Sequence, residues 1–262
     1  MPRVVSIAAI LSVFVLTQVP VEGGSRYKVI KVKKGATISG WISFSGELPE
    51  LIIPVETDAK TCCEKGQTSK RSPRLVVDGD RGVRNAVVYL TKIRAGKAFQ
   101  KGEYTLGQRS CTFVPHVVLM PQKERLKIKN GDPVLHNVHA LLDGTDVFNI
   151  ALAQKGQTIE KRMRRAGTIR LKCDAGHTWM SAYVIVAPHP YYALTDDKGN
   201  FSLEDIPPGK YTLRVWHEGW EKAKEIKIDV PVTLAEEQKI DLNFELKGDH
   251  TLAQKKSRDD NR

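Results

Sequence analysis

From residue 27 onward, the chain is a series of short segments rich in Val, Ile, Thr and aromatic residues, separated by Gly, Pro, Asp and Asn. Such segments, bounded by turn-forming residues, are typical of β-strands. They are residues 36–44, 74–79, 85–93, 113–120, 125–132, 137–142, 167–173, 181–188, 200–206, 210–216 and 226–232. Few windows show helical periodicity, so the pattern predicts an all-β chain built as β-sandwiches.

Composition sets the class of protein. The 262 residues carry 41 Lys and Arg against 30 Asp and Glu, for a net charge of +11, and 41% of them are hydrophobic. This balance is typical of one or two globular domains and excludes a disordered or collagen-like chain. Neither a G-x-x-x-x-G-K phosphate loop nor a G-x-S-x-G nucleophile elbow occurs, and we predict no enzymatic activity.

The N-terminus predicts export. Arg3 precedes an apolar run from Val4 to Leu16, and small residues follow at 23–25. We interpret residues 1–24 as a signal peptide, because the run is shorter than the roughly 20 residues that cross a membrane. Residues 23–25, which follow the apolar run, do not form a clear A-x-A cleavage site. An uncleaved membrane anchor is therefore the alternative. Only in that case would the chain contact a membrane. The expected location is periplasmic or secreted.

Positive charge suggests a partner. The densest patch is Lys161–Arg165. In an exported protein, such a patch favours an acidic protein partner rather than nucleic acid, although a solvated strand edge would look the same.

Four cysteines must be interpreted in an oxidising setting. Adjacent Cys62 and Cys63 could bond to each other only with strain, so we expect one of the two to pair with Cys111. Cys173 lies among different neighbours.

One loop combines soft metal ligands. Cys173, His177 and Met180 form a C-x3-H-x2-M element between two predicted strands, and His136 stands where another strand gives way to a loop. One thiolate, two imidazoles and a thioether are the set that a blue-copper site requires. Sulfur and imidazole suit copper better than Mg²⁺ or Ca²⁺.

Other residues near this loop are weaker candidates. Strand alternation places Asn137 and His139 on the face opposite His136, so we expect His139 to support the site or face solvent rather than bind metal. His116, in another strand, is a weaker candidate ligand. Trp179 is expected to pack over the site and limit its contact with water.

Residues 105–188 resemble the plastocyanin and azurin class of cupredoxins, which are Greek-key β-sandwiches. The resemblance rests on the sequence FVPHVVLM, on His136-Asn137-Val138 and on RLKCDAGHTWM. It implies copper as cofactor, with His136, Cys173, His177 and Met180 as ligands and Asn137 bracing the loop. The short spacing from His177 to Met180 is closer to the binuclear copper loop of cytochrome oxidase subunit II. That loop has a further cysteine where this chain has Ile169, so we expect a mononuclear centre.

A second resemblance covers the flanking segments. Asp196–Phe201 matches D-x-x-G-x-F and Pro208–Tyr211 matches P-G-x-Y, as in the carboxypeptidase regulatory-like family of small transthyretin-like sandwiches. Strands typical of the start of that family occur upstream, at 38–42 and 85–90. Our hypothesis is that residues 27–104 and 189–246 form this sandwich and that the cupredoxin-like part is inserted in it. Two sandwiches in tandem are the alternative. We interpret residues 247–262 as a charged flexible tail.

Three functions follow from these expectations. The first is one-electron transfer by an exported mononuclear copper protein. The second is periplasmic copper storage or delivery, which a shallow and rapidly exchanging site would favour. The third is an extracellular adhesion or carbohydrate-binding module, with an aromatic surface made by Tyr191, Tyr192, Trp216 and Trp220.

Overall fold

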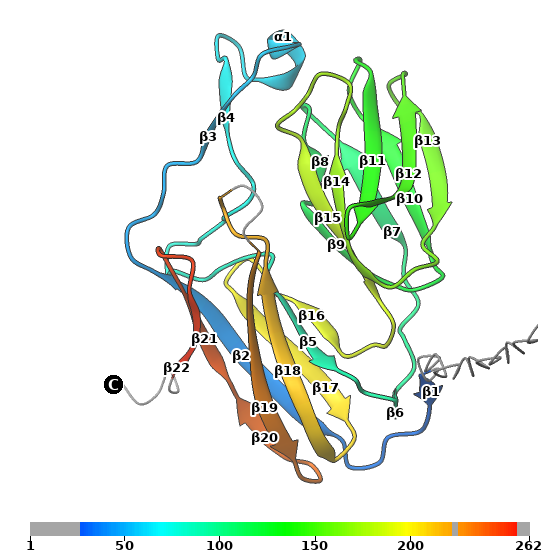
Figure 1. Cartoon of the computed structure of the whole chain (residues 1–262), viewed down its shortest axis with the longest axis vertical. Coiled ribbons are helices and arrows are strands. Elements are labelled where there is room, and N and C mark those ends of the chain that lie inside the picture. The colour runs from blue at the N-terminus through cyan, green and yellow to red at the C-terminus, as the bar shows by residue number, and fades with distance from the viewer. Residues whose placement is uncertain (1–26, 222–224, 256–262) are drawn as a thin grey trace, which may run out of the picture.

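The computed structural model describes residues 27–221 and 225–255. The proposed signal peptide therefore lies outside the described residues. Almost all regular structure is β, which confirms the predicted fold class, and the strands form two β-sandwiches (Figure 1). Within the described ranges, no helix has the length and apolar character needed to cross a membrane.

The first sandwich, called here the insert sandwich, is continuous in sequence. A four-stranded sheet in the order β13-β10-β7-β8 packs on a five-stranded sheet in the order β12-β11-β14-β15-β9. The strands are β7 (Tyr104–Gln108), β8 (Phe113–Val114), β9 (Val117–Pro121), β10 (Arg125–Asn130), β11 (His136–Leu142), β12 (Thr145–Leu152), β13 (Thr158–Arg162), β14 (Gly167–Lys172) and β15 (Ser181–Ala187).

The second, or outer, sandwich combines strands from both sides of the insert. One sheet has the order β16-β5-β18-β19 and the other β17-β2-β21-β22, with β20 also on β2. The strands are β2 (Ala36–Ser45), β5 (Val87–Thr91), β16 (Tyr192–Leu194), β17 (Asn200–Ile206), β18 (Gly209–His217), β19 (Ile226–Leu234), β20 (Lys239–Asp241), β21 (Asn243–Lys247) and β22 (Leu252–Lys255). Because β2 and β5 precede the insert and pair with later strands, this topology supports the proposed insertion.

Alternation builds both cores. In β10, Leu126 and Ile128 are buried while Arg125, Lys127 and Lys129 face solvent, as a two-residue period requires. Each sandwich has its own apolar core. A third apolar cluster lies between the sandwiches, where Tyr183 and Ile185 of β15 meet Val87 of β5 and Trp216 of β18.

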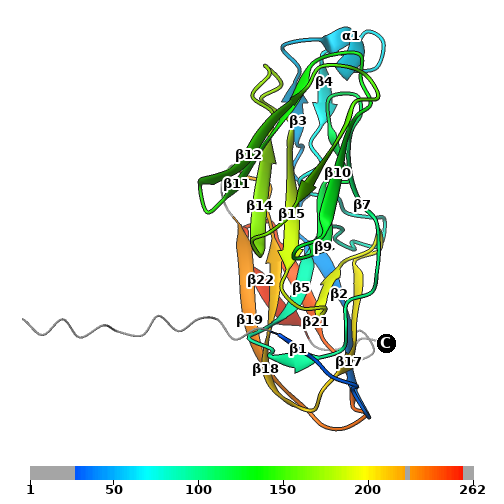
Figure 2. The same cartoon turned by 90° about the vertical axis from the view of Figure 1, so that its right-hand side faces the viewer.

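A segment of the outer part reaches the far end of the insert. Residues 51–72, called here the capping segment, contain β3 (Ile52–Pro54), α1 (Ala59–Cys62) and β4 (Ser69–Arg71). Figures 1 and 2 show it rising from the outer sandwich to the upper end of the insert, with α1 at the top. The short strands β1 (Lys28–Val29) and β6 (Ala95–Gly96) pair with each other in parallel.

The prediction that residues 247–262 form a flexible tail is wrong in part. Leu252–Lys255 form β22, which pairs with β21 and adds an ion pair between Lys255 and Glu245 at 2.6 Å. Leu252 also packs on the outer core. One apolar side chain and an unpaired neighbouring strand suffice to order these residues, while residues 256–262 lie outside the described part of the chain.

Candidate metal centre

Two histidines from different loops meet at the capped end of the insert. His136 begins β11, and His177 lies in the loop between β14 and β15. Both side chains are fully buried. Their Nδ1 atoms face each other at 3.1 Å.

Cys173 completes a cluster of three donors. It follows β14 directly, and its Sγ lies 3.8 Å from His177 Nδ1. The donor atoms of His136, Cys173 and His177 all lie within 4.8 Å of one another. The backbone N–H of Asn137 donates to Cys173 Sγ at 3.5 Å, which orients the sulfur toward the two rings.

Met180 ends the same loop. Its backbone N–H donates to the carbonyl of His177 at 3.0 Å, and its side chain belongs to the buried core that also holds Cys173. Gly176, with φ of +86°, supplies the left-handed turn that lets residues 173–177 double back. The loop thus places a thiol, an imidazole and a thioether at one end of a sandwich.

Carboxylates fix the orientation of both imidazole rings. Asp132 Oδ2 lies 2.8 Å from His136 Nε2, and Asp58 Oδ2 lies 2.9 Å from His177 Nε2. A carboxylate accepts hydrogen bonds, so each Nε2 carries the proton and each Nδ1 presents a lone pair to the cluster. Two lone pairs held 3.1 Å apart repel unless a cation or a proton lies between them. The donor set therefore fits a soft metal ion.

Electrostatics keep this arrangement in the required protonation state. Burial lowers the pKa of His136 below its usual value, although the hydrogen bond that its Nε2 donates to Asp132 opposes this. Burial alone would raise the pKa of Asp132, but the N–H groups of Cys111 and Ser110 together with His136 hold it below its usual range. A neutral imidazole beside an ionised carboxylate is the form that binds a metal.

Asn137 and Trp179 support the loop. The Asn137 side chain accepts from the backbone N–H of Asp174 and donates to Asn149, which ties the ligand loop to β11 and β12. The Trp179 indole donates to the carbonyl of Cys111 at 3.0 Å, and its ring lies 5.2 Å from the ring of His177. Asn137 thus links the loop to the neighbouring strands, and Trp179 packs against the ring of His177.

The disulfide fastens the capping segment over the centre. Cys62 of α1 is joined to Cys111, while Cys63 is free. The two bonded sulfurs lie within 4.8 Å of a ring nitrogen of His177. Thr57 also donates to the carbonyl of Gly176 at 3.2 Å. The segment thus covers the histidine side of the cluster.

His139 and His116 stand apart from this cluster. His139 donates from both ring nitrogens, to Asp174 at 2.6 Å and to Asp146 at 2.7 Å, and these bonds raise its pKa. His116 pairs with Glu218 where the two sandwiches meet. Neither belongs to any ligand cluster found in the described ranges.

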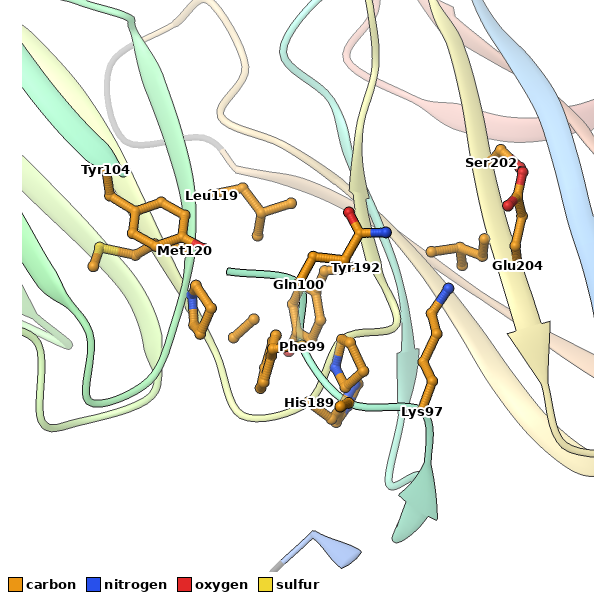
Figure 3. Close-up of a pocket in the computed structure, with 15 residues that line it drawn as sticks. Lys97, Phe99, Gln100, Tyr104, Leu119, Met120, His189, Tyr192, Ser202 and Glu204 are labelled. Atoms are coloured by element: carbon orange, nitrogen blue, oxygen red, sulfur yellow. The ribbon is translucent and has the colours of Figure 1, made fainter. Parts of the chain in front are cut away.

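A separate cavity lies where the chain passes between the sandwiches (Figure 3). It has a volume of about 300 Å³, and Tyr104, His189 and Tyr192 are among its lining residues. Burial lowers the pKa of His189 to about 4, so its ring is neutral, and it accepts the N–H of Tyr191 at 3.3 Å. None of the candidate ligands lines this cavity.

The sequence interpretation missed the two carboxylates. Asp132 had a local signal, since it stands four residues before His136 in a turn closed by the Asn130 side chain, which accepts the N–H of Asp132 at 2.9 Å. No local sequence signal pointed to Asp58, because it reaches His177 only through the way the capping segment folds over the insert.

Comparison with known families finds one match. The sequence profile of the carboxypeptidase regulatory-like domain matches residues 167–247, which is less than half of the chain. The matched range begins in β14 and β15, which pair with strands of the insert, and it omits β2 and β5. By strand pairing, β14 and β15 belong to the insert sandwich, while β2 and β5 belong to the outer one. No curated protein matches the chain.

Solved structures resemble part of the chain. A purple cupredoxin from Nitrosopumilus maritimus is 19% identical over 32% of this chain and 100% of its own, with a TM-score of 0.29. Amicyanin from Paracoccus versutus is 20% identical over 34% of this chain and 85% of its own, with a TM-score of 0.30.

A copper-containing nitrite reductase from Thermus scotoductus is 17% identical, with a TM-score of 0.29; the match covers 35% of this chain and only 24% of the reductase. The chain therefore combines a part similar to cupredoxins with a part similar to the carboxypeptidase regulatory-like domain.

Proposed function

We propose that this protein is an exported carrier of single electrons with one copper ion bound by His136, Cys173, His177 and Met180. The observation that supports this most strongly is the facing pair of Nδ1 atoms, each with its Nε2 held by a carboxylate, beside the Cys173 sulfur. Copper in such a site supplies a Cu(II)/Cu(I) couple, and thiolate with imidazole ligation suits both states.

The burial of the ligands favours electron transfer over copper delivery. Both histidines are fully buried, and a disulfide fastens the capping segment over them. A closed and pre-oriented site changes little between oxidation states, whereas delivery requires fast exchange of the metal. The carbohydrate-binding alternative loses its support, because Tyr191 and Trp216 are buried rather than displayed.

An acidic redox partner is part of this proposal. Arg162, Arg164 and Arg165 are exposed at the end of β13, and Arg125 and Lys127 are exposed on neighbouring β10. Such a cluster of cations attracts an anionic protein surface and speeds the encounter.

The test is an optical and EPR spectrum of the purified protein with one equivalent of Cu(II). We expect an intense visible thiolate-to-copper band, lost in Cys173→Ser and retained in Cys63→Ser, which removes a thiol outside the proposed ligand set. Weak copper binding that is unaffected by Cys173→Ser would sink the proposal.

A further inference from the structure

The candidate centre is closed on one side and accessible on the other. Asp58, Asp132 and the disulfide seal the histidines, which have no exposed surface. The sulfur residues keep slight exposure, 4% for Cys173 and 2% for Met180. Any small molecule that approaches the centre must therefore come from the sulfur side.

A cavity of about 480 Å³ lies on that side. Cys173 and Met180 form part of its wall. Leu51 of the capping segment and Trp220 of the outer sandwich also line it. This volume lies within the roughly 300–1,000 Å³ typical of small-molecule sites.

The charge of the wall is mostly positive. Because Ile169 and Leu171 of β14 point into the insert core, Arg170 and Lys172 project from the outer face, where they line the cavity with Arg74. Lys172 is paired with Asp174 at 2.9 Å, and Arg74 lies 3.9 Å from Glu218.

Arg170 differs from these two cations. Its backbone pairs within the sheet, but its guanidinium has no hydrogen-bond or ion-pair partner among the residues that the structure describes. An unpaired guanidinium in a cavity favours a carboxylate, which it can bind through two parallel N–H donors.

The cavity also has aromatic walls. Trp179 and Trp220 both line it. Indole rings bind planar aromatic groups well and stack favourably with them. We propose that this cavity binds a small aromatic carboxylate beside the sulfur ligands. The position next to the metal rests on the proposed function, but the binding itself requires no metal.

The test uses metal-free protein and two probes of matched size, 2-naphthoate and neutral 2-naphthamide, in isothermal titration at low ionic strength. We expect naphthoate to bind at least tenfold more tightly than naphthamide. Arg170→Gln should abolish this preference, and Arg170→Lys should keep part of it. Arg94→Gln, which removes an exposed cation between β5 and β6, away from this cavity, should leave it unchanged.

Three results would overturn the inference. They are no binding of naphthoate, equal binding of both probes, or the same loss of preference in Arg170→Gln and Arg94→Gln. The last result would indicate a general attraction of anions to a basic chain. Melting temperature checks that each variant is folded. A normal copper spectrum without naphthoate binding sinks only the cavity proposal. Arg170-dependent binding without a thiolate-to-copper band sinks only the copper proposal.

Discussion

Single carboxylates determine what the candidate ligands can do. His177 and His136 could each bind a metal through either ring nitrogen, and the acceptor at Nε2 selects Nδ1. The same contacts orient the rings before any metal arrives. Because Asp58 has a left-handed backbone with φ of 50° and a side chain that is 46% exposed, its role can be tested without disturbing the core.

Asp58→Asn should weaken copper binding by about tenfold, within the usual range for losing a group that supports a metal ligand. Asparagine tolerates the left-handed conformation, so the change removes the negative charge beside His177 and alters little else. Competition with a chelator measures the affinity. Asp146→Asn, beside His139 and outside the cluster, is the control, and equal affinity in all three proteins would refute the role given to Asp58.

The buried ring of His189 makes stability depend on pH. Burial lowers its pKa to about 4, below the value of about 6.5 in an unfolded chain, so the unfolded state binds the proton first. The stability from this group is present above pH 6.5 and is lost as the pH falls toward 4. Between pH 7 and pH 5 we expect a loss of about 2 kcal/mol.

Urea unfolding at the two pH values measures this loss in the wild type and in His189→Gln. The variant is expected to lose about 2 kcal/mol less, because glutamine does not titrate. An identical pH dependence in both proteins would show that His189 is not neutral in the folded state.

At the scale of elements, the site is a loop covered by a second segment. Residues 173–180 hold three of the four proposed ligands, and the capping segment closes them from outside. Besides the disulfide, a hydrogen bond from Lys70 to Thr112 Oγ1 at 2.8 Å attaches the capping segment to the insert. These two attachments hold α1, and hence Asp58, in place.

Removing the disulfide should therefore loosen both fold and site. The variant is Cys62→Ser with Cys63→Ser, compared with Cys63→Ser alone, so that Cys63 cannot replace its neighbour. We expect a loss of about 2–4 kcal/mol in the free energy of unfolding. Copper should also leave faster when a chelator is added. A release rate equal to that of the control would show that the capping segment does not retain the metal.

The elements also show how far sequence could predict this structure. Strands with buried alternate residues, such as β10 and β14, follow the predicted ranges because one face of each must be apolar. The edge strand β12 has exposed residues on both faces and gave no such pattern. Residues 74–79 were expected to be a strand but form only an isolated bridge at Val77. They lack a neighbouring strand, which a local pattern cannot reveal.

The candidate site was predictable to a similar extent. Cys173, His177 and Met180 share one loop, so their spacing was visible, and His136 was a candidate because it stands where a predicted strand gives way to a loop. Asp58 and the unpaired Arg170 gain their meaning only from distant segments that fold against them. Local patterns indicate candidate ligands, while tertiary contacts determine what surrounds them.

At the scale of the whole molecule, an apolar contact joins the two sandwiches. The rings of Tyr183 and Trp216 meet edge to face with centroids 5.1 Å apart. Val87 and Ile185 pack around them, and His116 pairs with Glu218 nearby. Trp216 is almost fully buried and is the largest side chain in this contact.

Trp216→Ala should lower stability by about 3–5 kcal/mol, as is usual for truncating a buried tryptophan. Because the contact couples the sandwiches, we also expect calorimetry to show two separate unfolding transitions in place of one. Trp216→Phe keeps an aromatic ring and should preserve a single transition. A single transition in Trp216→Ala would mean that the chain connections alone couple the two units.

The pairing of Tyr89 in β5 with Tyr192 in β16 has a consequence for the order of folding. These neighbours in one sheet lie at the two ends of the insert, so the sheet forms only after a long loop closes. An unfolded loop opposes closure through its entropy, whereas an insert that has already folded holds its ends in place. The insert should therefore fold first and bring β5 and β16 of the outer sandwich together. A substitution that slows the insert would leave β2 and β5 unpaired and exposed to aggregation, far from the substituted residue.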